Sequence, residues 1–205
     1  MNIVQFSTPT LPQPSRREIA RYMKSTANTD EIKDLITKGI SECEGKIIGK
    51  VIYREFPLAI ASNELDLGFG KCYSKDLKKM LQNDCASIIV FAATIGIGID
   101  RLLLKYSRTS PSLALCIQAI GAERVEALCD AFSFELKEKY DSLGLTLTPR
   151  FSPGYGDLPL SFQKNIFAAL ECEKHLGLTL NDSLLMSPTK SVTAIIGIKN
   201  SKENI

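Results

Sequence analysis

The sequence predicts an α+β fold, on three observations. Apolar residues at helical spacing run from about residue 111 to residue 140, which indicates one long helix with a core-facing side. Residues 87–93 form a continuous apolar run that is typical of a buried strand, and residues 192–198 indicate a last strand. Helical and extended segments do not alternate regularly, so a doubly wound parallel sheet is not favoured.

The N-terminal elements follow from local signals. Three prolines in residues 7–14 predict an extended lead-in. Ser15 and Glu18 then match a capping box, in which the serine caps the first turn of a helix and the glutamate reaches back to the serine. The apolar face of residues 32–43 predicts a second helix, which we expect to end at Gly45.

The next elements lead into the buried strand and out of it. Residues 46–53 are rich in β-branched side chains, which predicts a strand that Pro57 interrupts. A short helix is expected over residues 74–82. Gly96 and Gly98 stand where a phosphate loop would lie, but the third glycine of such a loop is missing, so a tight turn from strand to helix is favoured.

Turn residues divide the C-terminal part of the chain. Gly144 predicts the end of the long helix, and residues 145–151 predict another strand. After a segment rich in glycine and proline, Ser161 is expected to cap a helix that stops at Gly177. The strand over residues 192–198 completes the order of elements.

Composition limits the class of protein. The 205 residues are 44% apolar and carry a formal net charge of +2, which is typical of one globular domain and gives no electrostatic footprint for nucleic acid. The N-terminus lacks a signal-peptide pattern, and the most apolar stretch, residues 86–99, is shorter than the ~20 residues of a membrane span. We expect a cytoplasmic protein with no membrane partner.

Cysteine and histidine usage argues against a metal centre. None of the six cysteines stands in a C-x-x-C pair, and the chain has a single histidine, His175. Buried, reduced thiols are the favoured interpretation of the cysteines. His175 lies near the expected end of a helix, where its charge would interact favourably with the helix dipole.

The segment from Arg150 to Asp157 is the strongest candidate for a binding site. Its two glycines and its proline force an irregular backbone between a strand and a helix, and such a loop leaves main-chain groups available to a ligand. Arg150 can hold a carboxylate with two parallel hydrogen bonds, and Tyr155 offers a flat aromatic face. On composition alone an ordinary structural loop remains an equal alternative.

A family resemblance favours the binding site. Arg150-x-x-x-Gly154-Tyr155 resembles the R-x-x-x-G-Y signature of the activation domain of cobalamin-dependent methionine synthase. The resemblance covers residues 75–198 as a core, whereas residues 1–70 match loosely, and residues 1–205 are expected to form one activation-type domain. Other family-like segments are Phe91-Ala92-Ala93-Thr94-x-Gly96, Glu123-Arg124, Gln163-Lys164, Glu171-x-Glu173-Lys174-His175-x-Gly177-x-x-Leu180-x-x-Ser183 and Met186-x-Pro188-x-x-Ser191-Val192.

The resemblance implies a fold and a function. The family has a bent, mainly antiparallel sheet flanked by helices and binds S-adenosylmethionine in a shallow groove. It docks on a corrinoid protein, the cobalamin-binding methyltransferase, when the cobalamin has been oxidised to cob(II)alamin. An electron from a flavodoxin- or ferredoxin-type donor and the methyl group of S-adenosylmethionine then restore methylcobalamin. The chain is thus expected to be a free-standing reactivation partner of such an enzyme.

The resemblance also assigns site residues. Arg150 would take the ligand carboxylate, Gly154 would let the main chain approach the ligand, and Tyr155 would pack near the adenosyl or sulfonium region. An acid on the long helix would lie near the cationic end of the ligand, and Glu126, next to the aligned position Ala127, is the candidate. The full predicted S-adenosylmethionine site is Glu126, Arg150, Ser152, Pro153, Gly154 and Tyr155.

Two departures from the family keep alternatives open. Fused family members have a proline where this chain has Gly156, and they continue beyond the last strand to a tyrosine that contacts the ligand, whereas this sequence ends at Ile205. One alternative is therefore a docking module for another corrinoid methyltransferase, without turnover of S-adenosylmethionine. A second alternative keeps ligand binding but serves a different corrinoid client.

Overall fold

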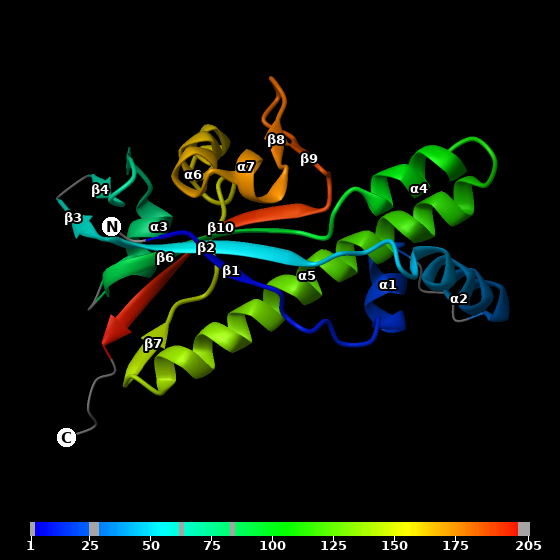
Figure 1. The fold of residues 1–205 in the computed structure, drawn as a ribbon, viewed down its shortest axis with the longest axis horizontal. Coiled ribbons are helices and arrows are strands. Elements are labelled where there is room, and N and C mark those ends of the chain that lie inside the picture. The colour runs from blue at the N-terminus through cyan, green and yellow to red at the C-terminus, as the bar shows by residue number, and fades with distance from the viewer. Residues whose placement is uncertain (1–2, 25–28, 62–63, 83–84, 201–205) are drawn as a thin grey trace.

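The centre of the molecule is a five-stranded sheet in which all neighbouring strands are antiparallel. The computed structural model describes residues 3–24, 29–61, 64–82 and 85–200. In sheet order the strands are β1 (Gln5–Ser7), β2 (Lys50–Pro57), β6 (Cys85–Thr94), β10 (Ser191–Asn200) and β7 (Leu145–Leu147). Helices flank this sheet (Figure 1), so the predicted α+β class with a mainly antiparallel sheet is confirmed.

Helices cover both faces of the sheet. Figure 1 shows the long α5 crossing beneath the strands, with α6 and α7 on the opposite side. On the first face α5 (Pro111–Asp141) contacts the strands, and α1 (Arg16–Tyr22), α2 (Asp30–Cys43) and α4 (Gly98–Tyr106) pack against α5 in the same core. The second face packs against α3 (Lys75–Leu81), α6 (Gln163–Leu170) and α7 (Cys172–Leu176). Five short strands complete the described elements: β3 (Ala59–Ile60), β4 (Leu65–Asp66), β5 (Lys71–Cys72), β8 (Thr179–Leu180) and β9 (Met186–Ser187).

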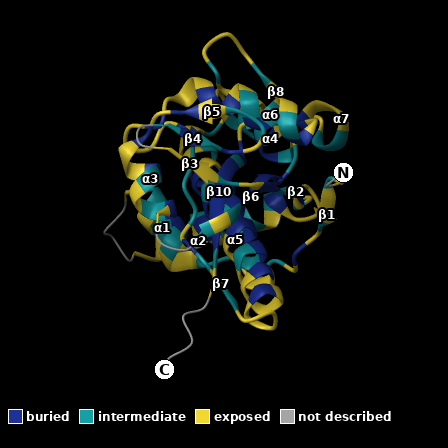
Figure 2. Cartoon of the chain, turned by 90° about the vertical axis from the view of Figure 1, so that its left-hand side faces the viewer, coloured by how far each residue is buried: buried dark blue, intermediate teal, exposed yellow. Residues whose placement is uncertain are grey.

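Strand β6 is buried on both faces, which explains its uninterrupted apolar sequence. Ile89 and Phe91 belong to the core beneath α5, whereas Ile88 and Val90 belong to the core beneath α6. The Phe91 ring lies 5.1 Å from the ring of Phe132 on α5. Figure 2 shows the sheet at the buried centre of the molecule, with the exposed residues outside it. Successive side chains of a strand point to opposite faces, so a strand covered twice has no polar face.

Helix α1 begins at the predicted serine, but its capping box is incomplete. The Ser15 side chain accepts a hydrogen bond from the Glu18 main-chain N–H at 3.4 Å, as expected of a cap. The predicted return bond from the Glu18 carboxylate is wrong, because that carboxylate pairs with Arg21 at 2.6 Å. The Ser15 N–H donates instead to Oε1 of Glu123 on α5, at 3.0 Å. A tertiary contact has therefore replaced the local one.

A buried ion pair holds the N-terminal lead-in against α5. The Arg124 Nε atom lies 2.5 Å from a carboxylate oxygen of Glu123, and both side chains are buried. The same guanidinium donates to the main-chain oxygens of Pro12 and Gln13, at 2.5 and 3.3 Å. The remaining guanidinium donors bind carbonyl oxygens, and these hydrogen bonds offset part of the cost of removing the two charges from water.

The strand predicted over residues 46–53 begins later than expected. Strand β2 spans Lys50–Pro57, and Pro57 is its last residue rather than an interruption. The residues before β2 pack against the turn between β6 and α4 instead: a Cβ atom on Gly98 would meet the Lys46 carbonyl oxygen at 1.9 Å. Gly98 thus allows a close approach of two main chains, which favours the structural interpretation of these turn glycines.

The C-terminal elements differ from the prediction in three details. The single helix expected to stop at Gly177 is two helices, α6 and α7, divided at Glu171, where φ is +49°. Strand β7 is shorter than residues 145–151, although a separate bridge joins Phe151 to Ile195 of β10. The cap predicted at Ser161 is wrong, because a 3₁₀ turn over Leu160–Phe162 precedes α6 and makes no side-chain cap. Helix α7 ends at Gly177, whose φ of +67° suits glycine. Within the described residues we find no helix with the length and apolar character needed to cross a membrane.

Candidate functional site

The segment around Arg150 is anchored to the sheet on one side and to α3 on the other. Phe151 exchanges two main-chain hydrogen bonds with Ile195 of β10, at 2.9 and 2.8 Å. The chain then leaves the sheet and turns at Gly154, where φ is +90°. The N–H of Gly154 donates to the carbonyl oxygen of Leu158 at 2.9 Å, which closes the loop. The loop is therefore held at both ends, as a binding loop on a rigid scaffold is.

Asp157 fixes the far end of this loop. Its carboxylate accepts hydrogen bonds from the Ser74 hydroxyl and from the main-chain N–H groups of Lys75 and Asp76, at 2.5, 2.7 and 3.2 Å. These bonds, with the Ser74 hydroxyl as the largest contribution, lower the pKa of Asp157 below its ordinary value. Gly156 lies close by, since a Cβ atom there would meet Oδ2 of Asp76 at 2.3 Å. A proline at position 156 would not fit, because φ there is +51° and proline holds φ near −65°.

A cavity of about 600 Å³ opens beside the loop. Its size falls within the ~300–1,000 Å³ range of small-molecule sites. It lies between the loop, the open edge of β10, and helices α5 and α6. The lining residues are Glu126, Arg150, Phe151, Ser152, Pro153, Tyr155, Leu160, Gln163, Leu184, Leu185, Met186, Thr189, Ser191, Val192 and Thr193.

One end of the cavity is charged. The Arg150 guanidinium pairs with Asp130 at 2.7 Å and with Glu126 at 3.4 Å, both on α5. Glu126 and Asp130 are four residues apart, which places them on the same side of the helix. Asp130 is 71% exposed and Arg150 is 25% exposed, so this cluster remains within reach of a ligand. It can offer one cation to a carboxylate and two carboxylates to a cationic group.

The mouth of the cavity is apolar. Tyr155 is 69% exposed and Leu185 is 62% exposed, and Leu160 is also exposed. Such side chains are normally buried, and exposed groups of them mark binding surfaces. An aromatic face at the mouth can pack against a nucleoside ring or a sulfonium centre.

The structure brings together most of the residues expected from the sequence. Glu126, Arg150, Ser152, Pro153 and Tyr155 all line the cavity, and they come from α5 and from the loop. Gly154 does not line it; it forms the turn that presents its neighbours. Its predicted role, a close approach of main chain to ligand, stays a prediction.

Sequence reasoning missed two parts of the site. Asp130 was not expected, because it lies 20 residues before Arg150 in the chain and nothing in its local sequence indicates that the two side chains are in contact. The wall formed by residues 184–193 was also not expected, although the family-like run from Met186 to Val192 was a signal. Gln163 connects this wall to α6, since its side-chain amide donates to the Leu184 carbonyl oxygen at 3.1 Å.

The cysteines and His175 lie outside this cavity. Among the described residues all six thiols are free, and five of the cysteines are buried. Burial raises the pKa of the Cys129 thiol to about 12, which keeps it protonated. His175 stands in the last turn of α7, where it contacts the carboxylate of Glu171 at 3.3 Å and the ring of Phe6.

Comparison with known proteins identifies a related family and a related structure. A family model described as the activation domain of vitamin B12 dependent methionine synthase matches residues 75–203, more than half of the chain. A search of curated protein sequences found no match. A crystal structure of the MetH reactivation domain bound to AdoHcy superposes with a TM-score of 0.64 at 16% identity, covering 99% of this chain and 80% of that one. At this identity the likeness establishes the fold.

Proposed function

The chain belongs to the family of vitamin B12 dependent methionine synthase activation domains, and we propose that it binds S-adenosylmethionine to reactivate a corrinoid methyltransferase. The client would be a cobalamin-dependent methionine synthase. The observation that carries this proposal is the cavity, which is lined by the Arg150 guanidinium, the Glu126 carboxylate and the exposed ring of Tyr155, with the Asp130 carboxylate paired to the same guanidinium. The related MetH reactivation domain has AdoHcy bound, which is the product of methyl transfer from S-adenosylmethionine.

The charged end of the cavity suits the amino-acid end of this ligand. The ligand carboxylate would bind Arg150, whose fork of N–H donors matches two carboxylate oxygens. The ligand ammonium group would lie near Glu126, with Asp130 contributing negative charge. Each charged group of the zwitterionic ligand would then lie beside a protein group of opposite charge.

The loop and the apolar mouth suit the rest of the ligand. Tyr155 would cover the adenosyl or sulfonium part, where a positive charge favours an aromatic face. Ser152 and Pro153 would form the wall between the two ends, and Gly154 would set the turn that places them. These residues constitute the proposed S-adenosylmethionine site together with Glu126 and Arg150.

The reaction needs two further components that this chain would not supply itself. The cobalamin is carried by the partner methyltransferase, and the electron comes from a flavodoxin- or ferredoxin-type donor. Cob(II)alamin, one electron and S-adenosylmethionine give methylcobalamin and S-adenosylhomocysteine, so the methyl group and the charges balance. We expect the reactivation to take place in the cytoplasm, because it is a reducing compartment in which free thiols persist.

Calorimetric titration with S-adenosylmethionine and S-adenosylhomocysteine tests the binding step. Both ligands are expected to bind at one site, and Tyr155→Ala is expected to weaken both. Tyr73→Ala, at a similarly exposed tyrosine that does not line the cavity, is expected to leave them unchanged. If neither heat nor a shift in unfolding temperature appears at millimolar ligand, the proposal is wrong and a docking module without ligand turnover is favoured.

Reconstitution tests the reactivation step. The chain would be mixed with a cob(II)alamin-loaded methionine synthase that lacks an activation domain, a reductant and S-adenosylmethionine, and the cobalamin spectrum would be followed. Methylcobalamin is expected only when all four components are present. Its appearance at the same rate without this chain would exclude reactivation, whatever the chain binds.

A further inference from the structure

The outer edge of strand β10 is only partly paired. Residues with even numbers in β10 direct their main-chain groups toward β6, and residues with odd numbers direct them to the other side, because strand groups alternate. Three odd residues have partners on that other side. Lys199 pairs with Thr146 of β7, the Gly197 carbonyl oxygen accepts from the N–H of Thr148, and Ile195 exchanges two bonds with Phe151. Ser191 and Thr193 are the next odd residues toward the start of β10.

The segment beside β10 departs before it reaches these residues. In the register of the bridge between Phe151 and Ile195, Pro153 would stand opposite Thr193, and proline has no N–H to donate. The chain turns away there into the loop. Within residues 85–200 we find no hydrogen bond to the Thr193 N–H or to the Ser191 carbonyl oxygen. Both residues line the cavity.

The two residues that carry these main-chain groups are nevertheless buried. Thr193 is 2% exposed and Ser191 is 7% exposed. Buried main-chain N–H and C=O groups are paired in the great majority of native structures, because leaving them unpaired costs free energy. An unpaired carbonyl is thus followed two residues later by an unpaired N–H, in two residues that line the cavity, and a ligand with the complementary pattern of donor and acceptor could pair with both groups.

We infer that the Ser191 carbonyl and the Thr193 N–H bind the N6–H and N1 positions of an adenine ring. The inference rests on the proposed function and adds to it the groups that select the base. Adenine presents a donor at N6 beside an acceptor at N1, in the order that a C=O and an N–H two residues apart require. Arg150 and Glu126 occupy the charged end of the cavity, so the amino-acid part of the ligand has its own partners there.

This edge would make the site selective for adenine over hypoxanthine. In hypoxanthine an oxygen replaces the N6 amino group and N1 carries a hydrogen, so both hydrogen bonds are reversed. Two carbonyl oxygens and two N–H groups would then face each other in a site with little water. A site built to pair with polar groups discriminates strongly against a ligand that leaves them unpaired.

The test combines nuclear magnetic resonance of the ¹⁵N-labelled full chain with calorimetry, using S-adenosylhomocysteine and S-inosylhomocysteine. With S-adenosylhomocysteine the Thr193 amide proton is expected to shift downfield and to exchange about tenfold more slowly, the factor of roughly one net hydrogen bond. The Val192 amide, which faces β6, serves as the internal control. S-inosylhomocysteine is expected to bind about 100-fold more weakly.

The outcomes separate this inference from the proposed function. If S-adenosylhomocysteine binds but the Thr193 amide does not respond, or if the inosyl compound binds equally well, the adenine assignment is overturned and the proposed function stands. If neither compound binds, both are overturned.

Discussion

Replacing Arg150 with alanine tests what the positive charge contributes to ligand binding at the proposed site. The guanidinium is the positive group at the charged end of the cavity, and it pairs there with Asp130 at 2.7 Å and Glu126 at 3.4 Å. The substitution removes the partner of the ligand carboxylate. It also leaves two carboxylates without their counter-charge, and these would repel an anionic group that enters the cavity.

The magnitude of the loss follows from the kind of bond. A hydrogen bond to a charged group contributes about 1.5–3 kcal/mol, and a two-pronged pair lies in the upper part of that range. A loss of about 2–3 kcal/mol corresponds to a dissociation constant roughly 30- to 150-fold higher. The fold should tolerate the change, since the main partner Asp130 is 71% exposed and exposed pairs contribute at most about 1 kcal/mol to stability.

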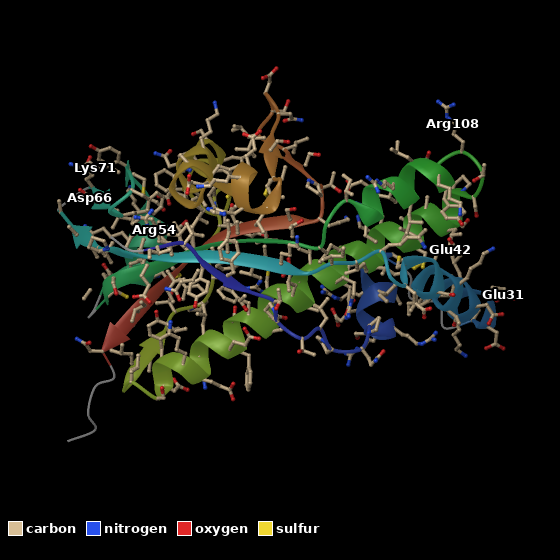
Figure 3. All side chains as sticks on the ribbon, viewed as in Figure 1. Glu31, Glu42, Arg54, Asp66, Lys71 and Arg108 are labelled. Atoms are coloured by element: carbon tan, nitrogen blue, oxygen red, sulfur yellow. The ribbon has the colours of Figure 1, made fainter. Side chains whose placement is uncertain are left out.

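Calorimetric titration with S-adenosylhomocysteine measures this loss, and thermal unfolding of the same samples checks the fold. Arg108→Ala is the matched control, because this arginine points into solvent far from the cavity (Figure 3). Arg150→Lys should recover part of the affinity, as it keeps the charge but not the fork. An unchanged dissociation constant for Arg150→Ala would show that the carboxylate is held elsewhere and would refute the assignment.

Three further predictions concern stability and reactivity. Glu123→Gln should lower the free energy of unfolding in urea by about 3–5 kcal/mol, because it leaves the buried Arg124 cation without its counter-ion; a loss below about 1 kcal/mol would contradict this. The lowered pKa of Asp157, caused first by the Ser74 hydroxyl, means that its contribution to stability is complete above the ordinary aspartate pKa and is lost as pH falls through the lowered value. Wild-type protein should therefore unfold at a higher temperature than Asp157→Asn at pH 7, and this gap should close in acid; a gap independent of pH would exclude the linkage. Cys129, whose pKa burial raises to about 12, should react with a maleimide at pH 8 only after unfolding; rapid labelling of the peptide that carries Cys129 in the folded protein, measured by mass spectrometry, would show that this thiol is accessible.

The order and type of the main elements were predictable because they depend on local patterns. The long stripe of apolar residues predicts α5, and the continuous apolar run of β6 arises because cores press on both of its faces. Ser15 and Ser74 cap their helices from within the same turn, so such signals can be seen in a short window of sequence. Boundaries set by distant contacts were not predictable. Strand β2 begins late because the residues before it pack against Gly98.

The sequence by itself determined the candidate loop, because its arginine, its glycines and its tyrosine stand within a few residues of one another. Only the tertiary structure decided what surrounds that loop. The carboxylate of Asp130 reaches Arg150 because α5 crosses the sheet beside it, and the edge at Thr193 stays open because a neighbouring segment turns away at Pro153. Contacts of this kind join residues that are far apart in the chain, and their formation depends on how the helices pack on the sheet rather than on any local preference.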